Sequence, residues 1–452
     1  MTVFAAPAHP PPLRKDPPVT SPPATAAVEI PLAAWTRDLK QSSLREIHVL
    51  LSRPGLLSFA LGMPAAELFP IRAYARAAQH VLRTEPDALQ YGLPVGRLRA
   101  HVVELMARRG VECTEAEVFL TSGAQHAMSL LGKLLVTPGG TVVVEEMAYD
   151  GMLNALRPLQ PRVLTVPSDL ETGMDLDALE ALLAGGERPA LVYAIPEGHN
   201  PLGTSMPAAN RRRLAELAAR YGVPVIEDDA YGLLGYDGEP PAAVRALEPR
   251  WTLYVGSFSK IIAPALRSGW VVAPPELVRR LSILKHGSDL DVCSLAQRTL
   301  AAFLDREDIG AHLARLRGAY TARRDAMLAA LAAHFPADAR WSCPSAGIFV
   351  WVQTPGTDTT ALLRRAVEEA GVAFVPGCAF CARGGERGGD ALRLNFSRTT
   401  TDEIHDGIAR LGRLLQPRGP VTAPPAGFCL GGDAAAECAA SRTNIGTHER
   451  RS

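Results

Sequence analysis

The hydrophobic residues of this chain gather in short runs, which are separated by polar tips and by segments with helical spacing. Between about residues 115 and 275 this order repeats, and several of the runs consist almost entirely of Val, Ile and Leu. Such runs are typical of strands that are buried on both faces of a mainly parallel sheet. The predicted strands are EVFLTSG (117–123), TVVVEE (141–146), ALVYAIP (190–196), VPVIEDD (223–229), TLYVGSFS (252–259) and GWVVAP (269–274).

The segments between these strands carry helix signals. In SMPAANRRRLAELAARYG (205–222), Ser205 is a candidate N-cap, Pro207 stands in the first turn and Gly222 is a candidate stop. Strands that alternate with helices over this length predict a doubly wound α/β fold.

A second unit follows the first. Residues 305–345 have a helical pattern, and further helices are predicted around 360–370 and 401–416. Two strand-like segments lie among them, GIFVWVQT (347–354) and ALRLNFSR (391–398). This mixture predicts a smaller α+β domain, and no fixed-period repeat suggests a solenoid.

Composition narrows the class of protein. The 452 residues are 47% hydrophobic and 21% charged, and Lys+Arg and Asp+Glu both number 47, so no net field favours nucleic acid or an anionic membrane. No apolar run approaches the roughly 18 residues of a membrane span. Of the seven cysteines, Cys378 and Cys381 form one C-x-x-C without a second pair, which argues against a zinc site. We expect a cytoplasmic protein without a metal.

Chemically useful side chains follow five of the predicted strands. In an open α/β sheet, ligands bind beyond the carboxyl ends of the strands, so these side chains are expected to meet at one edge. In chain order they are Gly123, Ala124 and Gln125, then Tyr149, Asn200, Asp228 with Tyr231, and Lys260.

The residue types at this edge suit a phosphorylated aldehyde cofactor. A glycine at a helix start, Ser257, Ser259 and Arg267 together suit a phosphate dianion. The chain has neither G-x-x-x-x-G-K-[ST] nor G-x-G-x-x-G, which argues against a nucleotide or dinucleotide. Pyridoxal 5'-phosphate needs such a phosphate site together with a lysine for its Schiff base and an acid for its pyridine nitrogen.

The sequence also resembles a family. The blocks that carry the resemblance are SFALGMPAAELFP, LQYGLPVGRLR, TSGAQHAM, YAIPEGHNPLG, VIEDDAYGLL, SFSKIIAPALRSGWVVAP, SAGIFVWV, FVPG and LRLNFS. In this order they resemble the fold-type-I aminotransferases, in the branch that includes 2-aminoadipate and aromatic aminotransferases. The resemblance runs from about Ser43 to Leu415 and implies an α/β fold with a mainly parallel seven-stranded sheet. It also implies transfer of the amino group of an L-amino acid to a 2-oxo acid.

The resemblance assigns roles residue by residue. Lys260 would form the Schiff base, Asp228 would pair with the pyridine nitrogen, and Tyr231 and Asn200 would bind the ring hydroxyl. Tyr149 would stack on the ring. The phosphate would be bound by Gly123, Ala124, Ser257, Ser259 and Arg267, with Gln125 beside them. The substrate would contact Arg393 through its α-carboxylate, with Asn200, Gly62 and Arg45 nearby.

Tyr91 would reach the phosphate of a neighbouring subunit, which implies a homodimer with shared active sites. The pattern and the resemblance together divide the chain into five parts. These are a disordered arm (1–41), the N-terminal part of a small domain (42–75), a large cofactor-binding domain (76–304), the rest of the small domain (305–416) and a disordered tail (417–452).

Departures from the family pattern leave alternatives open. His199, Leu202 and Met147 replace residues that relatives commonly carry near the cofactor, and His199 or His126 could shuttle a proton. The alternative is a pyridoxal phosphate enzyme of secondary metabolism that acts at Cβ or Cγ by elimination, replacement, cyclisation or annulation. A DNA-binding regulator with an aminotransferase-like domain is less compatible, because the segment before residue 42 is short and proline-rich for a helix-turn-helix module.

The substrate side chain is predicted from the residues around the site. Met147, Leu202 and Leu61 would make the pocket wall more apolar. Arg45 lies on an amphipathic helix predicted at 42–51, near the site entrance, where a mobile recogniser would suit several side chains. We therefore expect a substrate with a neutral or partly apolar side chain rather than aspartate.

Overall fold

The computed structural model describes residues 32–37, 55–92, 95–238, 240–385 and 387–416. The predictions for the N-terminal arm, for the helix at 42–51 with Arg45 and for the C-terminal tail therefore lie outside the described residues, except for the short helix α1 (Ala34–Arg37).

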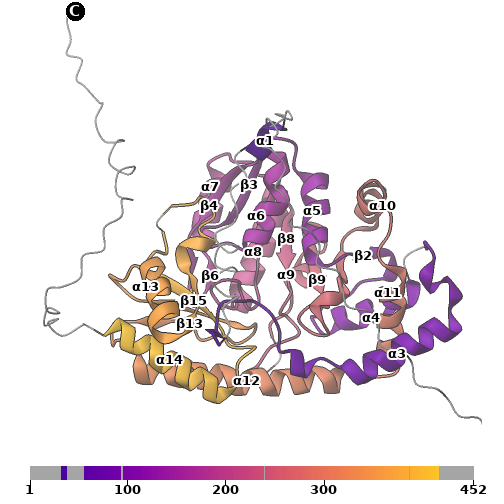
Figure 1. Ribbon diagram of the computed structural model, residues 1–452. Coiled ribbons are helices and arrows are strands. Elements are labelled where there is room, and N and C mark those ends of the chain that lie inside the picture. The colour runs from indigo at the N-terminus through magenta and orange to yellow at the C-terminus, as the bar shows by residue number, and fades with distance from the viewer. Residues whose placement is uncertain (1–31, 38–54, 93–94, 239, 386, 417–452) are drawn as a thin grey trace, which may run out of the picture.

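A seven-stranded sheet forms the centre of the molecule (Figure 1). Its strand order is β2-β10-β9-β8-β7-β3-β4, and every neighbouring pair is parallel except the two that involve β10. The predicted α/β fold with a mainly parallel sheet is confirmed. The strands are β2 (Val118–Thr121), β3 (Thr141–Glu145), β4 (Arg162–Val166), β7 (Leu191–Ala194), β8 (Val225–Asp228), β9 (Thr252–Ser257) and β10 (Gly269–Val272).

Helices cover both faces of this sheet. Successive side chains of a strand point to opposite faces, so Val142 and Val144 pack in one core cluster while Val143 packs in another. On the first face lie α5 (Ala124–Leu135), α6 (Asp150–Leu156) and α10 (Pro275–Asp289). On the second face lie α7 (Leu176–Ala184), α8 (Ala208–Tyr221) and α9 (Val244–Leu247).

Helix α8 differs from its prediction at the N-terminus. The cap position is Pro207, without a side-chain cap, and the Ser205 hydroxyl instead contacts the Gly198 N–H and the Glu197 carboxylate. The predicted stop is confirmed, because Gly222 ends the helix in the left-handed conformation that glycine adopts without strain.

A second, antiparallel sheet has the order β11-β12-β15-β14. An early segment of the chain joins this part, because β1 pairs with β13 and the Asn395 N–H donates to the Phe59 carbonyl. The strands are β1 (Leu57–Ser58), β11 (Arg340–Trp341), β12 (Phe349–Gln353), β13 (Val372–Ala373), β14 (Val375–Pro376) and β15 (Ala391–Asn395). Separately, β5 (Ser168–Asp169) and β6 (Gly173–Met174) form a two-stranded ribbon.

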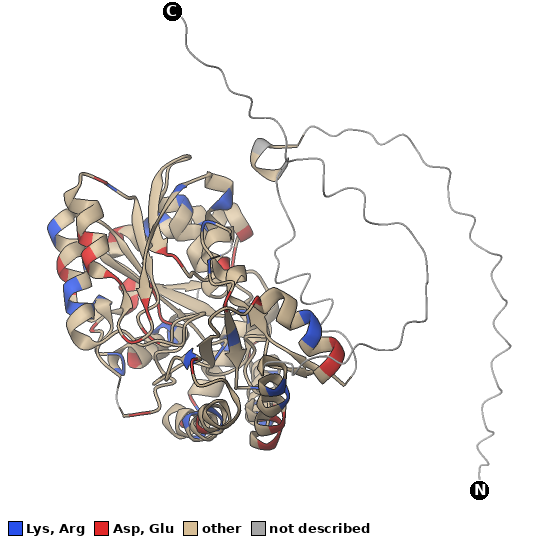
Figure 2. Ribbon diagram, turned by 90° about the vertical axis from the view of Figure 1, so that its left-hand side faces the viewer, with Lys and Arg blue, Asp and Glu red and all other residues tan. Residues whose placement is uncertain are grey.

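The remaining helices enclose these sheets. The long helix α12 (Ile309–His334) lies beside α14 (Thr401–Leu415), and α3 (Ile71–Thr84) lies beside α11 (Ser294–Leu304) (Figure 1). The others are α4 (Gly96–Ala107) and α13 (Thr359–Arg365). Among the described residues no helix is both long and apolar enough to cross a membrane. In the ribbon of Figure 2, acidic positions (red) and basic positions (blue) are interspersed along the visible helices, as the equal counts of the two signs suggest.

Candidate active site

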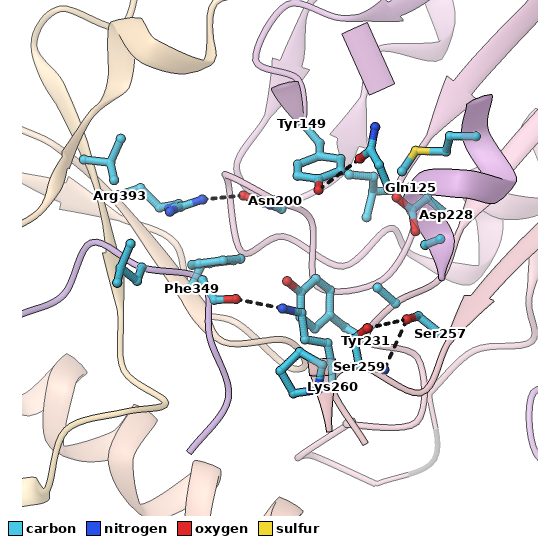
Figure 3. A pocket seen from close by; sticks show the side chains of 18 of the residues that line it. Gln125, Tyr149, Asn200, Asp228, Tyr231, Ser257, Ser259, Lys260, Phe349 and Arg393 are labelled. Atoms are coloured by element: carbon cyan, nitrogen blue, oxygen red, sulfur yellow. Dashed lines mark hydrogen bonds between the residues drawn. The ribbon is translucent and has the colours of Figure 1, made fainter. Parts of the chain in front are cut away.

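The chemically useful side chains converge on one cavity of about 330 Å³ (Figure 3). This volume lies in the range of small-molecule sites. The cavity lies where the carboxyl ends of the central strands face β12 and β15 of the second sheet. Its lining includes Leu61, Gly62, Ala124, Gln125, Tyr149, Asn200, Asp228, Tyr231, Ser257, Ser259, Lys260, Arg267, Phe349 and Arg393.

Strand direction explains this convergence. Asp228 is the last residue of β8 and Ser257 the last of β9, and Tyr149 and Asn200 follow β3 and β7. These four strands run parallel and so end at the same edge of the sheet. Side chains that lie more than a hundred residues apart in the sequence are thereby placed around one small volume.

One end of the cavity suits an anion with several oxygens. Gly123 precedes α5 with φ of 89°, and a Cβ there would lie 2.6 Å from Nη2 of Arg267. The backbone N–H groups at the start of a helix lack partners within the helix and carry its positive dipole end. Opposite them, the Ser257 and Ser259 hydroxyls lie 3.0 Å apart. Glycine, helix start, hydroxyls and guanidinium together fit a phosphate.

Asp228 is a buried carboxylate with one oxygen in use. Its Oδ2 accepts a hydrogen bond of 2.7 Å from the Tyr193 hydroxyl, whereas Oδ1 is buried and has no partner among the described residues. Burial raises the pKa of Asp228 to about 6, and Asp229 adds to the rise, while the Tyr193 hydrogen bond opposes it. A buried carboxylate oxygen without a donor is costly, so the site suits a ligand with an N–H.

Lys260 has the properties of a nucleophilic amine. Its Nζ donates to the Gly62 carbonyl at 2.7 Å. Burial, followed by the charges of Arg393 and Arg267, lowers the pKa of Lys260 to about 8, against the opposing effect of Asp228. A larger share of the amine is therefore unprotonated near neutral pH than for a lysine in water.

Arg393 is a buried cation held by neutral groups. Nη1 donates to Asn200 Oδ1 at 2.8 Å, and Nη2 donates to the Ala60 carbonyl at 2.7 Å. The guanidinium lies 4.1 Å from the Phe349 ring centroid and 4.6 Å from that of Phe380. Burial lowers its pKa to about 10, so it remains charged at neutral pH. No acidic side chain of the described residues pairs with it, which leaves its charge for an anionic ligand.

Two tyrosines complete the polar lining. The Tyr149 hydroxyl lies 3.5 Å from Gln125 Oε1, and Gln125 Nε2 donates to the Gly151 carbonyl at 2.6 Å. Tyr231 lies edge-on to Phe349 with ring centroids 6.1 Å apart. Burial raises the pKa of Tyr149 to about 12 and raises that of Tyr231 further, so both remain hydrogen-bond donors at neutral pH.

Some predicted residues do not line the cavity. Tyr91 is 81% exposed and lies apart from it, and Arg45 is outside the described residues. Of the three residues expected to make the wall apolar, only Leu61 lines it, because Met147 and Leu202 are packed in the adjoining core.

The two histidines have structural partners. Nε2 of His199 contacts Glu145 Oε2 at 2.9 Å, and Nδ1 accepts from the Leu202 N–H at 3.3 Å. His126 Nδ1 accepts from the Ser122 N–H at 3.2 Å. Neither ring lines the cavity. The suggested proton shuttle therefore has no support in this arrangement.

Sequence reasoning missed Tyr193, Phe349 and Phe380. Phe349 belongs to the block SAGIFVWV, where alternation along β12 could have placed it on the cavity side. Tyr193 stands inside the apolar run of β7, where the sequence predicts a core aromatic side chain. Nothing in the pattern indicates that its hydroxyl has a polar partner.

Comparisons with known proteins give a consistent result. A family model described as aminotransferase class I and II matches residues 57–411. The chain is 41% identical to the 2-aminoadipate transaminase of Thermus thermophilus, over 84% of this chain and 94% of that protein. It is 36% identical to aromatic-amino-acid aminotransferase 1 of Thermococcus litoralis, over 84% and 92%.

A solved structure is similar along most of both chains. It is the α-aminoadipate aminotransferase LysN from Thermus thermophilus, complexed with N-(5'-phosphopyridoxyl)-L-leucine. The TM-score is 0.78 at 38% sequence identity, and the alignment covers 85% of this chain and 97% of that one. The bound group in that structure joins a phosphopyridoxyl ring to an amino acid.

Proposed function

The chain belongs to the class I and II aminotransferases, in the branch with the 2-aminoadipate and aromatic aminotransferases. From this premise we propose a role for each site residue and a class of substrates. The protein is a pyridoxal phosphate enzyme that transfers the amino group of an amino acid to a 2-oxo acid. The named relatives favour this reaction over elimination, replacement or cyclisation at Cβ or Cγ.

The cavity fits pyridoxal phosphate. The unpartnered Oδ1 of Asp228 suits the protonated pyridine nitrogen, and the end of the cavity lined by Ala124, Ser257, Ser259 and Arg267 suits the phosphate. When bound, the cofactor supplies an aldehyde that takes the amino group and a ring that withdraws electrons from Cα. The phosphate would be held by Gly123, Ala124, Ser257, Ser259 and Arg267, the ring by Tyr149 and Gln125, and the ring hydroxyl by Tyr231 and Asn200.

Lys260 is the residue that we assign to the proton transfer. Its amine would hold the cofactor between turnovers, and once the substrate amine has displaced it, the free amine would take the proton from the substrate Cα and release it on the cofactor side. The position of Nζ in the cavity, where it donates to the Gly62 carbonyl, is the observation that carries this assignment. The pKa of about 8 agrees with it, because a base is most useful when its pKa lies near the working pH.

Arg393 is the residue that we assign to the α-carboxylate. Two hydrogen bonds and two aromatic rings fix the guanidinium, and no acidic side chain in the described ranges neutralises it. A carboxylate that binds a fixed guanidinium is oriented as well as attracted. The substrate is therefore an α-amino acid rather than a simple amine. Asn200 would link the two parts of the site, because it accepts a hydrogen bond from Arg393 and would also bind the ring hydroxyl of the cofactor.

The rest of the wall suits a neutral or partly apolar side chain. Leu61, Ile195, Phe349 and Val375 line the cavity, and the part of the lining that the structure describes offers no cation apart from Lys260, Arg267 and Arg393. Burying a second carboxylate among apolar side chains without a partner is unfavourable. Arg45 remains a proposed recogniser of acidic side chains at the entrance.

We expect leucine, phenylalanine and methionine to react faster than aspartate. Purified holoenzyme is mixed with each amino acid in turn, and the loss of the absorption band of the Lys260-bound cofactor is followed by stopped-flow spectroscopy. Glycine is the control for the contribution of the side chain, and a primary amine without a carboxylate is the control for the contribution of the α-carboxylate. Fast conversion by aspartate, with no response to larger neutral amino acids, would overturn this preference.

We also propose that the enzyme is a cytoplasmic homodimer with shared active sites. Tyr91 and Leu89 are 81% and 74% exposed and lie two residues apart, so both side chains are available for a contact with a second subunit. The hydroxyl of Tyr91 would complete the partner's phosphate site.

The five cysteines in the described ranges are free thiols, as a reducing compartment such as the cytoplasm favours. The division into a large domain (76–304) and a small domain (42–75 with 305–416) is likewise a proposal.

Replacing Tyr91 by phenylalanine tests the shared site. Removing a hydroxyl that donates to a phosphate costs one hydrogen bond to a charged group, so the cofactor should bind about tenfold more weakly. Equilibrium titration of the apoenzyme measures this, and sedimentation should show an unchanged dimer. A monomer that binds cofactor with full affinity, or a dimer indifferent to the substitution, contradicts the proposal.

A further inference from the structure

We propose that Tyr193 is a positioning residue for the reaction: its buried hydroxyl binds one oxygen of Asp228 and thereby aims the other oxygen, as a carboxylate, at the cofactor nitrogen. The inference rests on the proposed role of Asp228. Tyr193 does not line the cavity, so it acts on the ligand only through Asp228.

The sheet places the two side chains together. Tyr193 of β7 pairs in register with Ile226 of β8, and Asp228 lies two residues further along the same strand. Residues two apart on a strand share a face, so Asp228 is a diagonal neighbour of Tyr193. A tyrosine is long enough to span this diagonal, and the resulting hydrogen bond is 2.7 Å. Tyr193 is only 2% exposed, so the hydrogen bond is shielded from bulk solvent.

The hydrogen bond sets both the direction and the charge of the carboxylate. With Oδ2 bound to Tyr193, the unpartnered Oδ1 is the oxygen left for a ligand. A donor to the charged form of an acid favours ionisation. Burial raises the pKa of Tyr193 well above its ordinary value, so the phenol remains a donor throughout the working pH range.

Other groups around Asp228 cannot substitute for this donor. Asp229, the residue that follows β8, raises the pKa of Asp228, while His199 after β7 and Lys260 after β9 lower it through their charges. The charge of Asp228 also acts on the Tyr149 and Tyr231 phenols and raises their pKa values, but neither phenol donates a hydrogen bond to Asp228. Among the described residues, Oδ2 of Asp228 accepts its side-chain hydrogen bond from Tyr193, and Oδ1 accepts none.

The chain offers a matched control in Tyr254. This residue is also buried in the central sheet, and its hydroxyl donates at 2.8 Å to Oδ2 of Asp229. Asp229 does not line the cavity, and the same oxygen also binds Nε of Arg109 at 2.7 Å. Tyr254→Phe therefore removes the same kind of hydrogen bond from the neighbouring carboxylate without touching the site.

The test compares Tyr193→Phe with Tyr254→Phe. For Tyr193→Phe we expect the apoenzyme to bind pyridoxal phosphate about tenfold more weakly, as for a lost hydrogen bond to a charged group. Because the pKa of Asp228 rises when the donor is removed, the acid limb of kcat/KM should move up by about one pH unit. Tyr254→Phe should leave both quantities unchanged. If Tyr193→Phe does not fold, Tyr193→Met replaces it with the same expectations, since methionine fills irregular core space.

A double-mutant cycle separates this inference from the proposed function. In an Asp228→Asn background the further change Tyr193→Phe should no longer alter the pH profile, and its effect on cofactor affinity should shrink to within twofold. An undiminished effect in that background, or no effect of Tyr193→Phe in the native chain, overturns the positioning role alone. If Asp228→Asn itself leaves cofactor affinity and turnover unchanged, the proposed role of Asp228 fails instead.

Discussion

Replacing Lys260 by alanine is expected to lower the rate of transamination by about a thousandfold or more, the loss typical of a removed acid–base group. The substitution takes away both the amine that carries the cofactor and the base that moves the Cα proton. The phosphate and ring contacts of the cavity do not depend on Nζ, so the variant should still bind pyridoxal phosphate noncovalently. Steady-state turnover and the spectrum of the bound cofactor measure the two effects separately.

A second lysine gives the control for this experiment. Lys133 lies exposed on α5, outside the cavity, and Lys133→Ala should keep native turnover. Small primary amines added to Lys260→Ala should restore part of the rate, because a free amine can enter the space of the missing side chain. Turnover of the alanine variant within tenfold of the native enzyme would show that another residue transfers the proton.

Replacing Asp228 by asparagine should have opposite effects on the apoenzyme and on the loaded enzyme. With cofactor, the loss of a carboxylate from the pyridine nitrogen should weaken binding by about 10- to 100-fold, the range for a hydrogen bond to a charged group. Turnover should fall as well, because an unprotonated ring withdraws fewer electrons from Cα. Titration of the apoenzyme and a half-reaction with substrate measure these losses.

Without cofactor, the same substitution should stabilise the protein near pH 7. The folded pKa of about 6 lies above the ordinary aspartate pKa of 3.8, so between these values the folded state binds more protons than the unfolded state. Stability of the apoenzyme therefore falls as pH rises through this window. At pH 7 the neutral asparagine avoids a cost of up to about 3 kcal/mol. Chemical denaturation at pH 5 and pH 7 checks this, and an apoenzyme that loses stability equally at both pH values would contradict the account.

Much of the central sheet follows from the sequence because its strands are buried on both faces. The Val, Ile and Leu runs of β2, β3, β7, β8, β9 and β10 carry that signal directly. The edge strand β4 was missed, since only its last residue is fully buried and its pattern is mixed. The short strands β1, β13 and β14 were missed as well. A strand of two residues is too short to show an alternating hydrophobic pattern, and these strands form only through pairing with distant segments.

The site could be predicted as far as strand direction and residue type determine it. Lys260, Asp228 and Arg267 stand at strand ends or in a characteristic spacing, and the structure brings them to one cavity. Contacts that depend on packing could not be read in this way. Met147 and Leu202 flank cavity residues in the sequence but turn into the core. Tyr193 looks like a core aromatic, although its hydroxyl reaches Asp228.

The central claim is that pyridoxal phosphate is held on Lys260 in the cavity that Asp228 and Arg267 share. Borohydride reduction of the purified holoenzyme fixes the cofactor to the amine that carries it, and peptide mass spectrometry then locates the label. The chain has five lysines, at positions 15, 40, 133, 260 and 285, so the assignment is unambiguous. The account predicts one phosphopyridoxyl group per chain, on the peptide that contains Lys260. A label on Lys133 or Lys285, or an active enzyme whose Lys260 peptide stays unmodified, would contradict it.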